Sequence, residues 1–144
     1  MKGTTFAAAA LIAAASLQSQ ALADGSIAIA QPADDSGFSI GVSYNWEARA
    51  GADAEALRQC QSREAGLAPE QRAVCRLAAT YDNQCMALAK DEEDGGTAWG
   101  WGIGADQVEA DGVAMRQCRN YAGARGDYCR ITMRHCDGAA DGGK

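Results

Sequence analysis

The sequence predicts an α+β fold in which a β-β-α-β repeat occurs twice, with pseudo-two-fold symmetry, inside a single disulfide-stapled domain. Three observations predict this fold: an internal repeat, strand-like segments placed in the same way around both copies of a helix, and six cysteines that follow an export signal. We expect the domain to span residues 24–137, with the two repeats at about 26–85 and 86–136.

The repeat is clearest in one string, A-x-x-x-A-[L/M]-R-Q-C, which occurs at residues 52–60 and again at residues 110–118. Alanine favours helix more than any other residue, and the small residues of the string recur at helical spacing. In the second copy Asp106 can cap the helix, with Glu109 three residues later as in a capping box, and Gly123 can end it. Both strings are therefore predicted to be helices.

Strand-like segments precede and follow each predicted helix. They lie at residues 26–30, 37–44 and 74–80 in the first repeat, and at 85–89, 97–103 and 128–133 in the second. In the middle segment of each repeat, bulky and small residues alternate, so one face of the strand is bulky and the other nearly bare. A bare face allows close approach of a helix or second layer, whereas a bulky face must be buried in the core, a dimer or a ligand site. The sequence leaves open which face carries the helices.

Both ends of the chain differ in composition from the domain. Lys2, an apolar run at 6–15 and the A-x-A site before Asp24 predict a secretory signal peptide at 1–23, cleaved after Ala23. The apolar run is too short to span a bilayer and no cysteine follows it, so we expect no stable membrane anchor. Residues 138–144 offer little to bury, and we expect a flexible tail there. The mature protein is then periplasmic or extracellular.

All six cysteines fall in the mature part, and no C-x-x-C motif is present. An even number of cysteines after an export signal predicts a disulfide framework rather than a metal or redox site. Because the first three cysteines map in order onto the last three, a pseudo-symmetric pairing is favoured among the fifteen that are available. The expected pairs are Cys60–Cys75, Cys118–Cys129 and Cys85–Cys136, of which the last would join equivalent positions of the two halves.

The order of these features resembles a known family. An Ala-Ile-Ala strand, the segment Gly41-x-Ser-Tyr-Asn45, an alanine-rich helix ending in cysteine, a second cysteine strand and the segment Trp99-Gly-Trp101-Gly together resemble the bacterial secreted family catalogued as domain of unknown function 4189. The resemblance covers nearly the whole mature chain. It implies a small exported domain with no agreed activity, so no catalytic residue can be carried over.

No catalytic, cofactor-binding or metal-binding residue stands out in the sequence. His135 is the single histidine and directly precedes Cys136, so a structural or surface role is favoured over that of a general base. The acidic run at 91–96 lacks the spacing of an EF-hand and is interpreted as an acidic hairpin loop. Five arginines between residues 116 and 134 are interpreted as a solvated charged face.

The net charge and the aromatic residues of the sequence indicate which classes of partner to expect. The formal net charge is −6, and loss of Lys2 with the signal makes it −7, which argues against nucleic acid. Trp46, Trp99 and Trp101 form the candidate recognition surface for sugars, peptides or a second subunit, with core packing as the favoured alternative. We therefore expect a non-enzymatic interaction domain whose partner is an unknown protein or cell-envelope component, or a second copy in a homodimer. The alternative is a small cell-envelope hydrolase or an inhibitor of one.

Overall fold

The computed structural model describes residues 24–32, 38–69, 72–93 and 95–141. The expected signal peptide at 1–23 lies outside the described residues, as do residues 142–144. None of the described helices is long and apolar enough to cross a membrane.

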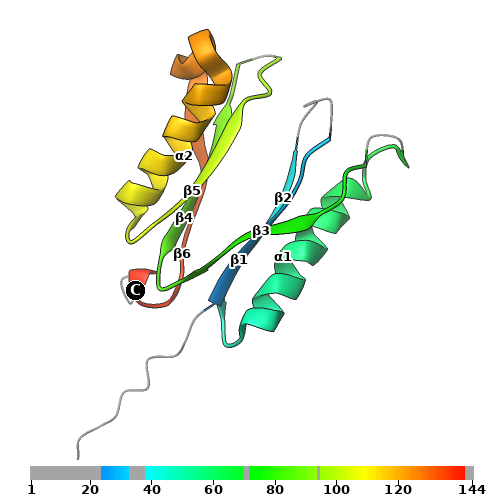
Figure 1. Cartoon of the computed structure of the whole chain (residues 1–144), viewed down its shortest axis with the longest axis vertical. Coiled ribbons are helices and arrows are strands. Elements are labelled where there is room, and N and C mark those ends of the chain that lie inside the picture. The colour runs from blue at the N-terminus through cyan, green and yellow to red at the C-terminus, as the bar shows by residue number, and fades with distance from the viewer. Residues whose placement is uncertain (1–23, 33–37, 70–71, 94, 142–144) are drawn as a thin grey trace, which may run out of the picture.

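The elements follow the expected β-β-α-β order twice, which confirms the fold class (Figure 1). The first unit contains β1 (Asp24–Ala30), β2 (Ser39–Trp46), α1 (Arg49–Glu64) and β3 (Arg76–Asp82). The second unit contains β4 (Cys85–Asp91), β5 (Trp99–Gly104), α2 (Gln107–Ala122), the 3-10 helix η2 (Gly123–Tyr128), β6 (Cys129–Cys136) and the 3-10 helix η3 (Gly138–Asp141). Each unit forms a three-stranded antiparallel sheet with its first strand in the middle, in the orders β2-β1-β3 and β5-β4-β6.

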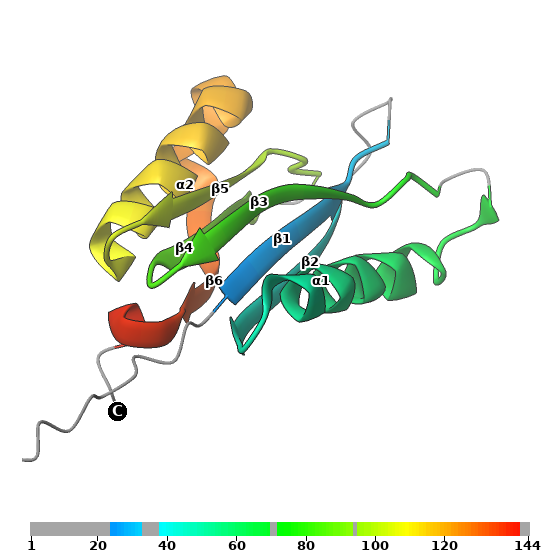
Figure 2. The same ribbon diagram turned by 60° about the horizontal axis from the view of Figure 1, so that its bottom comes forward.

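The two sheets pack face to face, and one helix covers the outer face of each sheet (Figures 1 and 2). The layer between the sheets holds the bulky side chains, among them Ile27, Val42, Met86 and Leu88. The faces toward the helices carry alanines and cysteines instead. The bulky faces are therefore buried against each other and the bare faces take the helices, which answers the question that the sequence left open. It also removes the bulky faces as the surface of a homodimer.

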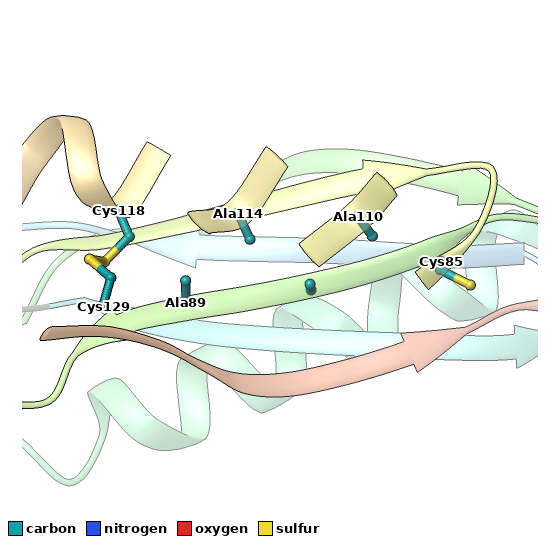
Figure 3. Packing of buried hydrophobic residues seen from close by; sticks show 7 residues of the cluster. Cys85, Ala89, Ala110, Ala114, Cys118 and Cys129 are labelled. Atoms are coloured by element: carbon teal, nitrogen blue, oxygen red, sulfur yellow. A yellow bond between two sulfur atoms is a disulfide. The ribbon is translucent and has the colours of Figure 1, made fainter. Parts of the chain in front are cut away.

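The small residues of the repeated string let each helix lie very close to its sheet. An added Cβ at Gly41 of β2 would overlap the carbonyl oxygen of Ala56 in α1. At the matching place in the second unit, an added Cβ at Gly100 would lie 2.6 Å from the carbonyl oxygen of Ala114. Figure 3 shows Ala110 and Ala114 of α2 directed at the small residues of β4. The alanines recur in the sequence because both interfaces exclude larger side chains.

Both ends of α2 are formed as the sequence predicts. The Oδ1 atom of Asp106 accepts a hydrogen bond from the backbone N–H of Glu109 at 2.8 Å, which satisfies one free donor of the first turn. The Oε2 atom of Glu109 accepts from the N–H of Ala105 at 2.8 Å. Gly123 follows the helix with φ of 58°, a conformation that glycine adopts without strain.

The structure contains the disulfides Cys60–Cys75, Cys85–Cys136 and Cys118–Cys129, which are the pairs that the repeat favoured. The first and third occupy equivalent positions and tie each helix to the strand that follows it. The reason that we gave for Cys85–Cys136 is wrong, because both cysteines belong to the second unit. Cys85 begins β4 and lies directly across from Cys136 of β6 in the same sheet.

The chain that follows β6 differs from the flexible tail that we expected from residue 138. Its first part forms η3, in which the N–H of Gly138 donates to Oδ1 of Asn45 at 2.9 Å and the N–H of Ala139 donates to Oδ1 of Asn83 at 2.8 Å. Composition suggested a tail because these residues have no large apolar side chain to bury. Their backbone donors are instead held by two asparagine side chains from outside the second unit.

Candidate functional site

A cavity of about 590 Å³ opens beside the free edge of β5. Its volume falls within the range of about 300–1,000 Å³ that is typical of small-molecule sites. The residues that line it come from both sheets and from α2: Ile29, Gln31, Ala78, Thr97, Ala98, Trp99, Trp101, Gln117 and Tyr121. No charged side chain is among these described residues.

Aromatic rings form much of the cavity wall. Trp99 and Trp101 are both half-buried on the bulky face of β5, and Phe38 stacks on Trp99 with ring centroids 4.2 Å apart. Tyr121 of α2 stands at the cavity with 72% of its surface exposed. These rings combine apolar surface with polar atoms at their edges, as the aromatic residues of recognition sites do.

Gln117 supplies a directed polar group to the cavity. Its Oε1 atom accepts a hydrogen bond from the backbone N–H of Trp101 at 2.8 Å, so the side chain is held across the edge of β5. Its Nε2 atom donates to no residue in the described part of the chain. Gln117 and Tyr121 are four residues apart and therefore lie on the same face of α2. The amide donor is thus held in place beside two aromatic rings.

The three predicted recognition residues do not form one surface. Trp99 and Trp101 line the cavity, but Trp46 lies at the other end of the β1–β2 ladder, opposite Asp24. The backbone of Asn45 has φ of 58°, and the strand register shifts there, which turns the indole of Trp46 toward Gly51 at the start of α1. The alternation that placed Trp46 with the other bulky residues ends at this irregularity.

His135 is packed against an aromatic ring rather than against a catalytic partner. Its imidazole stacks on Tyr44 with ring centroids 4.2 Å apart and planes inclined by 15°. Burial lowers the pKa of His135. No Ser, Asp or Glu of the described residues hydrogen-bonds it.

The acidic run is tied to one of the five arginines, and a second arginine pairs with an aspartate outside the run. Asp91 is buried at the end of β4, where its Oδ2 atom lies 3.0 Å from a guanidinium nitrogen of Arg125 in η2 and its Oδ1 atom accepts from the N–H of Glu93. Arg134 likewise lies 2.6 Å from Asp111. The described residues contain no group of three or more His, Cys, Asp or Glu side chains that could hold a metal ion. Asp91 is thus paired with an arginine of the same unit.

Asp137 is a fully buried carboxylate directly after β6. Its Oδ1 atom accepts from the backbone N–H of Asn45, while its Oδ2 atom has no hydrogen-bond partner in the described chain. Burial raises the pKa of Asp137, the hydrogen bond from the backbone N–H of Asn45 opposes this shift, and the carboxylate of Asp82 adds to it. Asp137 therefore links β6 to the end of β2 through a hydrogen bond, and burial of its carboxylate costs desolvation free energy.

We expect Asp137→Asn to raise the free energy of unfolding at pH 7 by about 1 kcal/mol, because asparagine keeps the acceptor and removes a buried charge. A raised pKa means that the folded chain holds this proton more tightly than the unfolded chain. Asp137 therefore destabilises the fold increasingly as pH rises above the unfolded value of about 4, and the gain from the variant should disappear below that pH. Urea denaturation at pH 7 and pH 3.5 measures this, with Asp127→Asn as the exposed control. A gain of equal size at both pH values would contradict the assignment.

Sequence reasoning identified two of the residues at the cavity and missed the others. Gln117 was visible as part of the repeated string, but nothing in that string distinguishes it from Gln59. Tyr121 and Thr97 carried no signal, since each becomes part of a site only when α2 lies beside β5.

A family model described as "Domain of unknown function (DUF4189)" matches residues 25–136. The match runs from β1 to the end of β6 and so includes both units. No curated protein and no solved structure matches the chain significantly.

Proposed function

The chain belongs to the DUF4189 family, whose description assigns no function, and we propose from the geometry that this protein is an exported, non-enzymatic binding domain whose site is the cavity beside β5. The observation that carries the proposal is the combination, in one open cavity, of the half-buried pair Trp99 and Trp101 with an amide donor that has no partner in the described chain. Concave sites that combine aromatic surface with a few directed polar groups are where proteins bind small ligands.

The surroundings of His135 support binding without catalysis. General acid–base chemistry needs a group within hydrogen-bond reach of the reacting atoms, and nucleophilic catalysis needs a base beside the nucleophile. His135 is stacked on Tyr44 and is not among the residues that line the cavity. The hydrolase alternative therefore has no observation in its favour.

Export is supported by the covalent structure and by the position of β1. The chain has three disulfides, which are consistent with an oxidising compartment. Cleavage after Ala23 would leave Asp24 as the mature N-terminus, and Asp24 is the first residue of β1. Its carboxylate lies 2.8 Å from the guanidinium of Arg49, so the proposed mature N-terminus is held against the start of α1.

The experiment begins with the full-length gene expressed in a bacterium and the protein recovered from the periplasm or medium. Its intact mass should correspond to a chain that starts at Asp24 with three disulfides, and any other start would contradict the proposed cleavage. A Trp46→Phe form is then titrated with a panel of neutral ligands: an oligosaccharide, a blocked peptide and an aromatic alcohol. Because Trp46 lies away from the cavity, the remaining emission reports Trp99 and Trp101. We expect at least one ligand to shift this emission saturably, and a panel that leaves it unchanged would refute the binding site.

A further inference from the structure

We propose that the cavity beside β5 binds a neutral pyranose glycan, with the aromatic rings of Trp101 and Tyr121 packing on the sugar and Nε2 of Gln117 donating to a sugar oxygen. This inference rests on the proposed function and names its ligand class. The evidence comes from comparing the two units. The first unit has the same strand, helix and glutamine as β5 and α2, but it lacks the aromatic residues and the unpaired amide donor.

The two equivalent glutamines are used differently. Gln59 accepts from the N–H of Val42 in β2 at 3.2 Å, just as Gln117 accepts from Trp101 in β5. The Nε2 atom of Gln59, however, donates to Oε1 of Glu55 at 2.8 Å and is satisfied within the protein. The position equivalent to Glu55 in the second unit is Val113, which cannot accept a hydrogen bond. The amide N–H of Gln59 is therefore hydrogen-bonded within the first unit, whereas the equivalent N–H of Gln117 is available to a ligand at the cavity.

The aromatic residues differ between the units in the same way. Matching the two glutamine contacts places Val42 at the position of Trp101, and Ile40 at the position of Trp99. The helix alignment places Arg63 at the position of Tyr121. The scaffold positions, which are the alanines, the close-packed glycine, the glutamine and the cysteine, are the same in both units. Three of the residues that line the cavity, Trp99, Trp101 and Tyr121, are therefore aromatic in the second unit and aliphatic or charged at the matching places of the first.

The chemistry of the lining favours a sugar. Pyranose rings present C–H groups on their faces, which pack on aromatic rings, and hydroxyl or acetamido oxygens at their edges, which accept hydrogen bonds. Besides Gln117 Nε2, the hydroxyls of Thr97 and Tyr121 and both indole N–H groups make no hydrogen bond to a described residue. The described lining residues are all uncharged and offer apolar surface with hydrogen-bonding groups, which suits a neutral sugar.

A peptide is disfavoured by the edge of β5 itself. An extended peptide that adds a strand to a sheet needs the free backbone groups along the edge. The N–H of Trp101 lies in the middle of that edge and is already occupied by Gln117. A peptide strand would have to displace this side chain, whereas a glycan uses it.

The test is calorimetric titration of the exported protein, with all its disulfides, using tri-N-acetylchitotriose and maltotriose as probes. The decisive variant is Gln117→Glu, because a carboxylate can still accept from Trp101 but has no N–H to donate. We expect the Kd for the bound sugar to rise about tenfold in this variant and in Tyr121→Ala, as the loss of one directed contact from a small ligand implies. The matched controls are Gln59→Ala, which removes the equivalent strand contact outside the cavity, and Tyr128→Ala, an exposed tyrosine that does not line it. Both controls should change the Kd less than twofold.

The outcomes separate this inference from the proposed function. Binding of either sugar that weakens in the cavity variants and not in the controls supports both. If the peptide or the aromatic alcohol binds through the cavity and neither sugar does, the glycan is wrong and the binding function stands. Sugar binding that is unchanged by Gln117→Glu and Tyr121→Ala overturns the glycan site, and a protein that binds none of the panel overturns both.

Discussion

Replacing Gly41 with alanine should lower the free energy of unfolding by about 3 kcal/mol, the upper part of the range for overpacked sites. The added Cβ would overlap the carbonyl oxygen of Ala56 and lie 2.7 Å from the backbone nitrogen of Cys60. These are backbone atoms of α1 and cannot rotate away, so the helix must move off the sheet. That movement loosens the layer of small residues formed by Ala28, Ala30, Ala56 and Cys60. Urea denaturation with the disulfides intact measures the loss.

Gly112→Ala is the matched control for this substitution. Gly112 lies within α2, and the nearest atom to an added Cβ is a guanidinium nitrogen of Arg116 at 3.4 Å, at the end of a flexible side chain. Because glycine in a helix costs about 0.5–1 kcal/mol relative to alanine, this variant should be more stable than the natural protein. If both variants lose stability equally, close helix–sheet contact at Gly41 is not the reason.

Replacing Cys85 and Cys136 together with alanine should lower the free energy of unfolding by about 4 kcal/mol. This disulfide closes a loop of 51 residues, the longest of the three, so its removal releases the most conformational freedom in the unfolded chain. It also joins β4 to β6 at the end of the sheet that leads into Asp137 and η3. The first unit has no such bond, since Asp24 and Asp82 face each other at the equivalent place.

The double variant Cys118→Ala with Cys129→Ala provides the comparison. Its loop spans 11 residues, for which the same relation predicts a loss of about 3 kcal/mol. Denaturation of both double variants at one pH and temperature gives the difference. A greater loss from the short loop would show that packing around Cys118 and Cys129, both of which are fully buried, outweighs chain entropy.

The disulfide pairs and the order of elements could be predicted because they follow from local pattern and from duplication. Alternation with a period of two indicated the strands, and the repeated string indicated the helices and matched one half of the cysteines to the other. The reason given for Cys85–Cys136 was nevertheless wrong. Linear order placed Cys85 at the end of the first repeat, whereas the sheet places it across from Cys136 in the second unit.

The candidate site could be predicted only in part. Trp99 and Trp101 share one face of one strand, so their alternation in the sequence already placed them together. Gln117, Tyr121 and Gln31 come from segments that are distant in the sequence, and only the packing of α2 and the sheets brings them to one cavity. Trp46 was grouped with the other tryptophans because the positive φ of Asn45, which reverses the face of the strand end, has no unambiguous signature in the sequence.

By itself the sequence determined the duplicated β-β-α-β order, the cysteine pairs and the family, because each of these depends on residue spacing along the chain. Only the tertiary structure decided which strand face carries the helices, that the bulky faces bury each other, and that residues of both sheets and α2 line an open cavity. The physical reason is that spacing assigns a side chain to a face of its own element and does not say what that face will meet. Gln59 and Gln117 occupy the same position of the repeated string. Only their neighbours in space determine that the amide N–H of Gln59 is hydrogen-bonded within the protein and that of Gln117 is available to a ligand.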